Sequence, residues 1–322
     1  PFGDLTFHLK GVHYGFEICE DAWRGKIRPG YRLKDRKVDL IFNPSASHFA
    51  MGKTHERKAL MERSSELFDC FYCYTNLLGN ESGRMIFDGE ILLAKEGKLL
   101  ARNQLLSFQD YQVFSFYLEN KPQHLAHIQP KEWEFAQASA LGLYDYLRKS
   151  KSKGFVLSLS GGADSSSIAV LVAEMVRRGI HELGVEKFVE KSGIQLTHGS
   201  NNPEKELVNQ LLTTAYQGTR NSSDDTFQSA KNLAESLGAQ FYAWTIDEEV
   251  TSYTEKIETA LGRKLTWETD DLALQNIQAR SRSPIIWLLT NIKNALLLST
   301  SNRSEGDVGY ATMDGDTSGS IS

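Results

Sequence analysis

The chain has little cysteine, no surplus of positive charge and no long apolar run. Its three cysteines, Cys19, Cys70 and Cys73, are few and odd in number among 322 residues. Such a count is typical of a reducing compartment, so we expect a cytoplasmic protein. The formal net charge of −5 predicts no large basic surface, and hence no nucleic-acid partner. Because no apolar run reaches the length of a membrane span, we expect no membrane partner either.

The remaining composition is ordinary for a soluble globular protein. Hydrophobic residues make up 40% of the chain and charged residues 24%, and the length allows two domains. The chain begins at Pro1 without a methionine and ends at Ser322 in a stretch rich in glycine and serine. We therefore expect a fragment of a longer chain.

Cys70 and Cys73 have the spacing of a redox pair. They lie, however, in an aromatic, strand-like run that ends at Tyr74, and positions three apart face opposite sides of a strand. We therefore favour a packing role over redox chemistry for both cysteines. No second group of Cys or His accompanies them in the sequence, so no zinc site is predicted.

The clearest chemical pattern lies at 155–165, Phe-Val-Leu-Ser-Leu-Ser-Gly-Gly-Ala-Asp-Ser. Residues 155–159 are rich in β-formers, which predicts a short buried strand. The two glycines after Ser160 permit a tight turn, and a helix is expected from about Asp164. At such a junction, free N–H groups and the positive end of the helix dipole point at one spot, which suits a phosphate.

This stretch differs from two common phosphate loops. It has neither the lysine of Gly-x-x-x-x-Gly-Lys-Ser/Thr nor the spacing of Gly-x-Gly-x-x-Gly. It has hydroxyls instead, at Ser158, Ser160 and Ser165, and a carboxylate at Asp164. A carboxylate beside a phosphate is repulsive unless a cation lies between them, so Asp164 predicts Mg²⁺. A Ser/Gly-rich turn without a ligand is the alternative, which we favour less.

The segment Ser160-Gly-Gly-Ala-Asp-Ser165 resembles the pyrophosphate-binding loop of the ATP-pyrophosphatase superfamily. These enzymes cleave ATP between the α and β phosphates and adenylate a substrate oxygen. The resemblance implies a Rossmann-like parallel-sheet domain with ATP as a substrate. It assigns ATP contacts to Ser158, Leu159, Ser160, Gly161, Gly162, Ala163, Asp164 and Ser165.

Cys19 lies at the end of another strand-like run, from Val12 to Ile18. A cysteine at a sharp strand-to-helix turn is typical of a nucleophile, because nearby N–H groups can stabilise an oxyanion. A free thiol is only slightly ionised at neutral pH and needs a base or a cation nearby. From the spacing alone, a buried structural cysteine explains Cys19 equally well.

The surrounding residues favour the nucleophile. The segment Gly15-Phe-Glu-Ile-Cys-Glu-Asp21 resembles the nucleophile segment of the nitrilase superfamily, and most closely the glutaminase domain of glutamine-dependent NAD synthetases. That resemblance implies an α-β-β-α sandwich. It also extends to Asn43-Pro-Ser-Ala-Ser47 and Gly52-Lys53, and implies that Ser47 and Lys53 contact glutamine. A lysine and a hydroxyl suit an α-carboxylate, although without the family a polar loop explains them equally well.

One departure from the nitrilase pattern concerns the other catalytic groups. The family uses Cys, Glu and Lys together, and its Glu and Lys lie well upstream of the nucleophile. Only 18 residues precede Cys19 here, and Lys10 and Glu17 are too close to it to take those places. Either the N-terminal part is missing or the amidase half is inactive; we favour a missing part.

The pattern of predicted elements divides the chain into two domains. In the first, at 1–119, a helix at 55–68 and strands at 71–78, 85–87, 91–93 and 111–118 fit the nitrilase layering. Residues 120–130, with two prolines, predict a linker. The second domain, at 131–322, has predicted strands at 207–216, 240–246 and 296–300 and a helix at 225–237. The loop 217–223 follows the first of these strands, at the end where α/β proteins bind ligands.

Thr269-Asp-Asp-Leu272 opens a further predicted helix that carries Asn276 and Arg280 on one face. An arginine there can pair with a phosphate or carboxylate through two hydrogen bonds. The segment, together with Arg282, closely resembles the NAD synthetase motif that contacts deamido-NAD. By the same resemblance, Thr300 matches an ATP contact and Glu305 a ligand of Mg²⁺ or of the dinucleotide.

Together these resemblances predict a glutamine-dependent NAD synthetase, which amidates deamido-NAD with ATP, Mg²⁺ and ammonia from glutamine. We expect glutamine, ATP and deamido-NAD as small-molecule partners and a homo-oligomeric assembly. Two alternatives remain open. One is another ATP-dependent amidotransferase that acts on a different carboxylate, and the other is an inactive relative that serves as a binding or scaffold protein.

Overall fold

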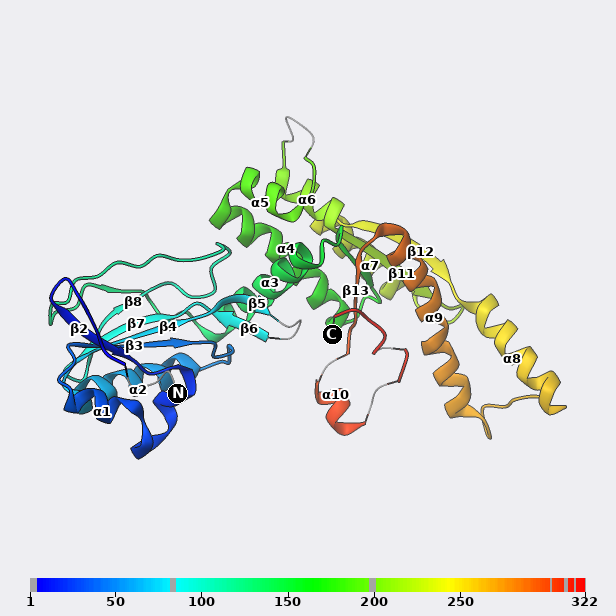
Figure 1. Ribbon diagram of the computed structural model, residues 1–322. Helices are drawn as coiled ribbons and strands as arrows, with labels where there is room; N and C mark the ends of the chain where they lie inside the picture. The colour runs from blue at the N-terminus through cyan, green and yellow to red at the C-terminus, as the bar shows by residue number, and fades with distance from the viewer. Residues whose placement is uncertain are drawn as a thin grey trace. The chain divides into compact units, whose positions relative to one another are not determined.

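The computed structural model describes residues 5–81, 85–196, 201–301, 303–309, 312–315 and 317–321 (Figure 1). The chain divides into two compact units, Pro1–Tyr146 and Leu147–Ser322. Helix α3, Lys131–Ser150, crosses this division. The short strand β9, His124–Leu125, lies inside the predicted linker. Among the described residues, no helix is long and apolar enough to cross a membrane.

Unit 1 is built on a seven-stranded sheet with the strand order β1-β2-β3-β4-β7-β8-β9. The three strands β2, β3 and β4 run parallel, whereas β4, β7 and β8 pair antiparallel. A separate antiparallel pair is formed by β5 and β6. The strands are β1 Phe7–Leu9, β2 Val12–Phe16, β3 Leu40–Ser45, β4 Phe71–Asn76, β5 Leu78–Glu81, β6 Met85–Asp88, β7 Ile91–Lys95 and β8 Lys98–Arg102.

The two faces of this sheet have different neighbours. Helices α1, Pro29–Asp35, and α2, Lys53–Phe68, pack on one face, where Leu60, Met61 and Phe68 join a large apolar core. On the other face, Leu40, Cys73, Leu93, Leu100 and Ala101 form a second cluster, and no described helix contributes to it. An apolar groove of about 580 Å³ is open on the side of β1 to β4. The described residues thus supply one helical layer and one large sheet of the predicted α-β-β-α arrangement.

The expectation for Cys70 and Cys73 is confirmed. Both thiols are free and buried, and they lie in the clusters on opposite faces of the sheet. Burial raises the pKa of each thiol to about 12. A thiol that stays protonated at neutral pH is a poor nucleophile, which fits a packing role.

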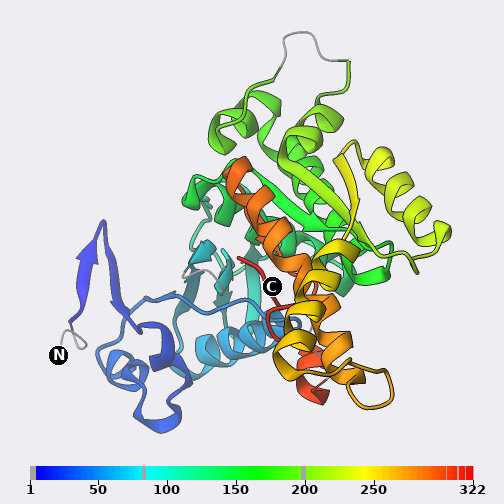
Figure 2. The ribbon, with the colours of Figure 1, turned by 90° about the vertical axis from the view of Figure 1, so that its right-hand side faces the viewer.

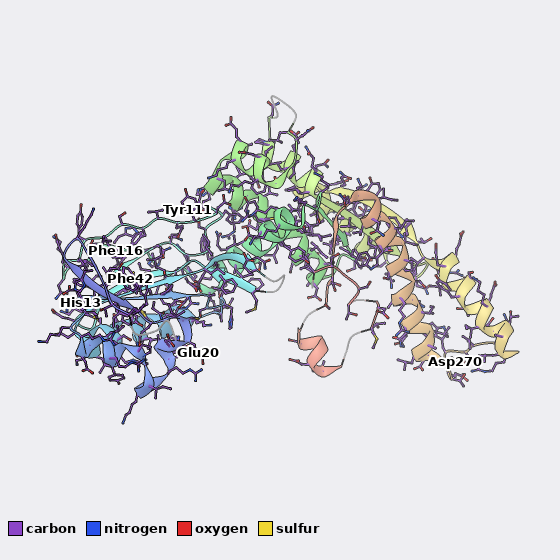
Figure 3. The ribbon with its side chains drawn as sticks, viewed as in Figure 1. His13, Glu20, Phe42, Tyr111, Phe116 and Asp270 are labelled. Atoms are coloured by element: carbon purple, nitrogen blue, oxygen red, sulfur yellow. The ribbon has the colours of Figure 1, made fainter. Side chains whose placement is uncertain are left out.

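The predicted strand at 111–118 is wrong, because this segment has no regular strand hydrogen bonds. Its alternation is nevertheless real. Phe114 and Phe116 pack on the sheet cluster that contains Phe42, whereas Tyr111 is 75% exposed and Val113 82% exposed. Figure 3 labels Phe42, Phe116 and Tyr111. An alternating pattern therefore identified which side chains face the sheet, but not whether the backbone pairs with it.

Unit 2 contains a four-stranded, wholly parallel sheet with the order β12-β11-β10-β13. Its strands are β10 Phe155–Ser158, β11 Leu212–Gly218, β12 Gln240–Thr245 and β13 Leu296–Leu298. The helices are α4 Ala163–Leu183, α5 Val185–Ser192, α6 Pro203–Leu211, α7 Asp224–Leu237, α8 Asp247–Leu261, α9 Asp271–Lys293 and α10 Arg303–Val308. Figure 2 shows α9, in orange, lying across the strands, where Ile286 packs on Val156, Ala215 and Leu297. The predicted parallel-sheet architecture is confirmed.

One predicted strand of unit 2 began too early. Residues 207–211 belong to helix α6, and only 212–218 form β11. Asn202 accepts a hydrogen bond from the Lys205 N–H, and Pro203 occupies the first turn, so a helix starts here. Leu207, Val208 and Leu211 are buried at helical spacing, which a short apolar run cannot distinguish from a strand.

Candidate functional site

The loop between β10 and α4 is built around a left-handed glycine. Gly161 has φ +83°, and a Cβ at this position would lie 2.4 Å from the backbone oxygen of Thr226 on α7. Gly162 is the extended residue that precedes α4, and no side chain caps this helix end. Close approach to α7 therefore requires glycine at 161, and the first turn of α4 presents its amides without a side-chain cap.

The serines of this loop hydrogen bond to one another. The Ser160 N–H donates to Ser165 Oγ at 3.2 Å, the two hydroxyls lie 3.1 Å apart, and the Gly162 N–H donates to Ser160 Oγ. Ser165 is buried, whereas Asp164 is exposed in the first helical turn. Ser160 and Ser165 thus hold the loop in shape from within, and Asp164 faces solvent where an approaching ligand can reach it.

A pocket of about 350 Å³ opens at the carboxyl ends of β10, β11 and β13. Most of its polar lining consists of hydroxyl groups, with one cation, Arg282; within the described part of the chain, no carboxylate lines it. Its walls are Ser158, Ser160, Tyr216, Gln217, Ser222, Thr226, Ala279, Arg282, Ser283, Ile286, Leu297, Leu298, Ser299, Thr300, Gly315 and Ser318. A mixed apolar and hydroxyl lining beside a phosphate-type loop suits a nucleotide.

The contacts of two pocket residues, Gln217 and Arg282, were not predicted, although the sequence had placed Gln217 in a candidate ligand loop and Arg282 in the segment that resembles the deamido-NAD motif. The Gln217 side-chain amide donates to Ser158 Oγ at 3.1 Å and accepts from the Trp244 indole N–H at 3.3 Å. Arg282 donates through Nε to the Gln217 backbone oxygen at 3.2 Å and through Nη1 to Gln278 O. These groups come from β10, β11, β12 and α9. The sequence showed that Gln217 opens the loop after a predicted strand and that Arg282 belongs to the helix motif, but not that the two residues meet.

The remaining predicted residues of unit 2 do not all lie at the pocket. Thr300 lines the pocket. Asn276 and Arg280 lie on α9 outside the lining, where Asn276 Oδ1 accepts from Thr312 Oγ1 and Arg280 Nε donates to Met313 O at 3.0 Å. Glu305 belongs to α10, but its side chain lies outside the described residues. The structure therefore brings Thr300, but not Asn276 or Arg280, to the pocket.

The described residues offer Mg²⁺ one carboxylate at the loop. Protein-bound Mg²⁺ commonly uses one or two carboxylates together with substrate phosphates and water. Asp164, exposed beside uncapped helix amides, fits that pattern. Among the described residues, no group of three or more His, Cys, Asp or Glu side chains could hold an ion.

In unit 1, Cys19 occupies a strained turn at the end of β2. Its φ is +49°, in the left-handed region that side-chain-bearing residues rarely adopt. It begins a short 3-10 helix, η1 Cys19–Trp23, in which the Ile18 N–H donates to the Asp21 carboxylate at 2.8 Å. The thiol is free and partly exposed. This is the geometry of a side chain held up at a strand end, as expected for a nucleophile.

Ser47 lies on the loop that follows β3, and Lys53 lies on the helix after that loop. Lys53 begins α2 and donates through Nζ to His48 O at 3.1 Å. Partial burial, together with the charge of Arg57, lowers the pKa of Lys53, and the Cys19 thiolate acts against this shift. Ser47 donates its N–H to Asn76 Oδ1 at 2.8 Å.

A buried ionic network, also missed from the sequence, supports Ser47. Arg57 is fully buried and pairs with Asp88 at 2.5 Å and Glu90 at 3.0 Å. Its Nη2 donates to Ser47 O at 3.0 Å and to Ser47 Oγ at 3.2 Å. Burial, and then the charge of Asp88, raises the pKa of Glu90. In the sequence, Arg57 is one of several cations in a helix, and nothing local marks it as buried.

Comparisons with known proteins agree with this layout. The sequence model of the NAD synthase family matches residues 135–322. The glutamine-dependent NAD(+) synthetases of Bos taurus and Drosophila melanogaster are each 28% identical over 97% of this chain, which covers 52% and 47% of theirs. The chain thus spans about half the length of these curated relatives.

Solved structures extend the similarity to both units. The crystal structure of a glutamine-dependent NAD(+) synthetase from Cytophaga hutchinsonii is 53% identical over 99% of this chain and 53% of its own, with a TM-score of 0.88. A glutamine-dependent NAD+ synthetase from Acinetobacter baumannii, in complex with ADP, is 22% identical over 99% of this chain and 54% of its own. Its TM-score is 0.76, and it shares the fold.

Proposed function

Because this chain belongs to the NAD synthase family, we propose that it forms part of a glutamine-dependent NAD synthetase. The enzyme would amidate deamido-NAD to NAD with ATP and with ammonia released from glutamine. The observation that carries this proposal is the presence, on one chain, of a left-handed cysteine, Cys19, after a parallel strand and of a glycine turn at Gly161 between a parallel strand and the start of α4. The relatives that match nearly the whole chain are named for that combined activity.

We place the glutaminase part at 1–119, a linker at 120–130 and the synthetase part at 131–322. In the first part, the Cys19 sulfur attacks the side-chain amide carbon of glutamine, and the C–N bond breaks. The thiol proton passes through a base to the departing nitrogen, so ammonia leaves and a thioester remains. Water then attacks the thioester, which releases glutamate and the thiol. Lys53 and Ser47 would bind the α-carboxylate of glutamine by charge and hydrogen bonding.

In the synthetase part, the carboxylate of deamido-NAD attacks the α phosphorus of ATP, and pyrophosphate leaves. A free carboxylate resists ammonia because its leaving group is oxide, whereas the acyl adenylate has AMP as a good leaving group. Amides of the loop 158–165 would bind the departing pyrophosphate at the positive end of α4. Ammonia then attacks the acyl carbon, AMP leaves, and the amide of NAD is formed.

The contacts assigned in unit 2 follow the same scheme. Thr300 and residues 158–165 would contact ATP, while Asn276, Arg280 and Glu305 would contact deamido-NAD. Asp164 and Glu305 would hold Mg²⁺, which supplies positive charge to the phosphates when bound. We further propose a cytoplasmic homo-oligomer that takes these three small molecules and no nucleic acid or membrane as partners.

The test is a turnover assay of the full-length protein with deamido-NAD, ATP and Mg²⁺, and with either glutamine or ammonium as the nitrogen donor. Cys19→Ala should abolish NAD formation from glutamine and leave NAD formation from ammonium intact. Loss of both activities, or of neither, contradicts this division between the two parts. Pyrophosphate release with another carboxylic acid, but not with deamido-NAD, would favour a different amidotransferase.

A further inference from the structure

The carboxylate of Glu17, two residues before Cys19, is fully buried and surrounded by donors. Arg28 donates to it through Nη2 at 2.6 Å and through Nε at 3.2 Å. The Gly30 N–H donates to Oε1 at 2.8 Å, and the Tyr72 hydroxyl donates to Oε2 at 2.5 Å. Two oxygens thus accept four hydrogen bonds, from the residue before α1, the first turn of α1 and strand β4, two strands away from β2 in the sheet.

The donors are themselves held in place. Arg28 is 6% exposed, stacks 4.8 Å from the Phe68 ring centroid and donates to Ser64 Oγ at 3.0 Å. A Cβ on Gly30 would lie 2.4 Å from the Phe68 ring and 2.8 Å from Glu17 Oε1. The backbone therefore approaches the carboxylate as closely as it does only because residue 30 is glycine.

The main chain around Glu17 is fixed from the other side. Its N–H donates to Phe42 O at 2.9 Å. The Asn43 side-chain amide donates to Glu17 O at 2.7 Å and reaches Cys19 O at 3.5 Å. Glu17 is thus immobilised through both its side chain and its backbone, two residues before the left-handed Cys19.

Stability alone explains this arrangement poorly. A buried ion pair is weak evidence for stability, because the cost of removing both charges from water offsets much of their attraction. A residue with a side chain in the left-handed region, by contrast, persists only where its surroundings over-determine the backbone. The network supplies that constraint at the one residue proposed to react.

We propose that Glu17 and Arg28 are positioning residues that hold the Cys19 turn and so aim its thiol at the glutamine amide. They touch neither substrate nor the reacting atoms and act through the backbone of 17–19. This inference rests on the proposed glutaminase role of Cys19. It predicts a loss in the rate of thiol attack rather than in the binding of glutamine or in the chemistry of unit 2.

The test compares Glu17→Gln with a matched buried carboxylate of unit 1, Asp145→Asn, in the full-length protein. Asp145 is 2% exposed and accepts from the Asn80 N–H at 2.7 Å. Glu17→Gln should lower kcat with glutamine by about 100-fold, as expected for a misaimed reactive group. KM for glutamine and NAD formation from ammonium should not change. Asp145→Asn should leave the ratio of glutamine to ammonium activity as in the wild type.

Tyr72→Phe provides a milder variant should Glu17→Gln fail to fold. It removes one donor and keeps the ring, and should lower kcat with glutamine about tenfold, in line with one hydrogen bond to a charged group. The rate at which iodoacetamide alkylates Cys19, followed by peptide mass spectrometry, should fall in both variants.

The outcomes separate the two proposals. An unchanged ratio of glutamine to ammonium activity, together with unchanged Cys19 alkylation, overturns the positioning role. A wild-type protein that uses ammonium but never glutamine contradicts the glutaminase role. The alkylation rates of the variants would still decide whether Glu17 positions the thiol.

Discussion

The two candidate sites both begin where a parallel strand ends, but their turns are built differently. The turn after β10 uses glycine, and Gly161 adopts φ +83° without a side chain. The turn after β2 places a cysteine at φ +49°, and a buried ionic network surrounds Glu17, two residues before it. A turn that binds a ligand through backbone amides can omit side chains, whereas a turn that presents a nucleophile cannot. The second kind must be stabilised from outside the turn.

The largest expected effect comes from adding a methyl group to the glycine-built turn. Gly161→Ala would place a Cβ against Thr226 O, so the loop must move away from α7. We expect NAD formation from glutamine and from ammonium to fall together by more than about 100-fold.

The control is Gly262→Ala, also at a left-handed position, φ +67°, but with no atom within 4 Å of the added Cβ. It should lose stability through backbone strain alone, by about 1 kcal/mol, and keep its activity. Equal activity losses in the two variants would contradict the role of close packing between Gly161 and α7.

A second test removes the buried cation that supports Ser47. Arg57→Met leaves Asp88 and Glu90 buried without their partner, so unfolding free energy should fall by about 3–5 kcal/mol. Urea denaturation measures this change. Arg263→Met, which breaks the pair with Asp270 in unit 2 at a site where Arg263 is half exposed, should change the urea midpoint little. A similar shift in both variants would remove the distinction between the buried and the exposed ion pair.

A smaller effect should appear at the strained residue itself. Cys19→Gly and Cys19→Ala both lose the thiol, but only glycine adopts φ +49° without strain. We expect Cys19→Gly to be more stable than Cys19→Ala by about 1 kcal/mol, as measured by thermal unfolding. Equal stability would mean that the left-handed turn is not strained.

The smallest predicted effect concerns pH. Because burial lowers the pKa of Lys53, its ammonium loses its proton at a lower pH than a free lysine does. Glutamine binding through that charge should therefore weaken as the pH rises toward the lowered pKa, seen as a rising KM. Lys53→Arg should remove this rise, since arginine stays protonated. An unchanged pH profile in that variant would exclude Lys53 as the group responsible.

The glycine-built turn could be predicted from the sequence because its determinants are local. A β-rich run, two glycines and three serines are adjacent in the chain, and strand β10 and helix α4 lie where those residues indicated. Contacts between residues that are far apart in the chain could not be predicted in the same way. Gln217, Trp244 and Arg282 meet through three separate elements, and Glu17 meets Arg28 and Tyr72 across 11 and 55 residues.

The errors have a similar origin. Residues 207–211 are apolar and short, and whether such a run forms a helix or a strand depends on the cap at Asn202 and Pro203. The alternation at 111–118 showed its inward side chains, Phe114 and Phe116, but backbone pairing requires a neighbouring strand edge. Periodicity thus predicts which side of a segment is buried more reliably than what its backbone bonds to.

The central claim is that the bend between β10 and α4 binds the phosphates of ATP. A crystal structure of the full-length protein with ATP and Mg²⁺ tests it most directly. We predict that the β and γ phosphates lie against the amides of residues 160–165, with the metal beside Asp164. Phosphates bound elsewhere, with this bend empty at saturating nucleotide, would contradict the account.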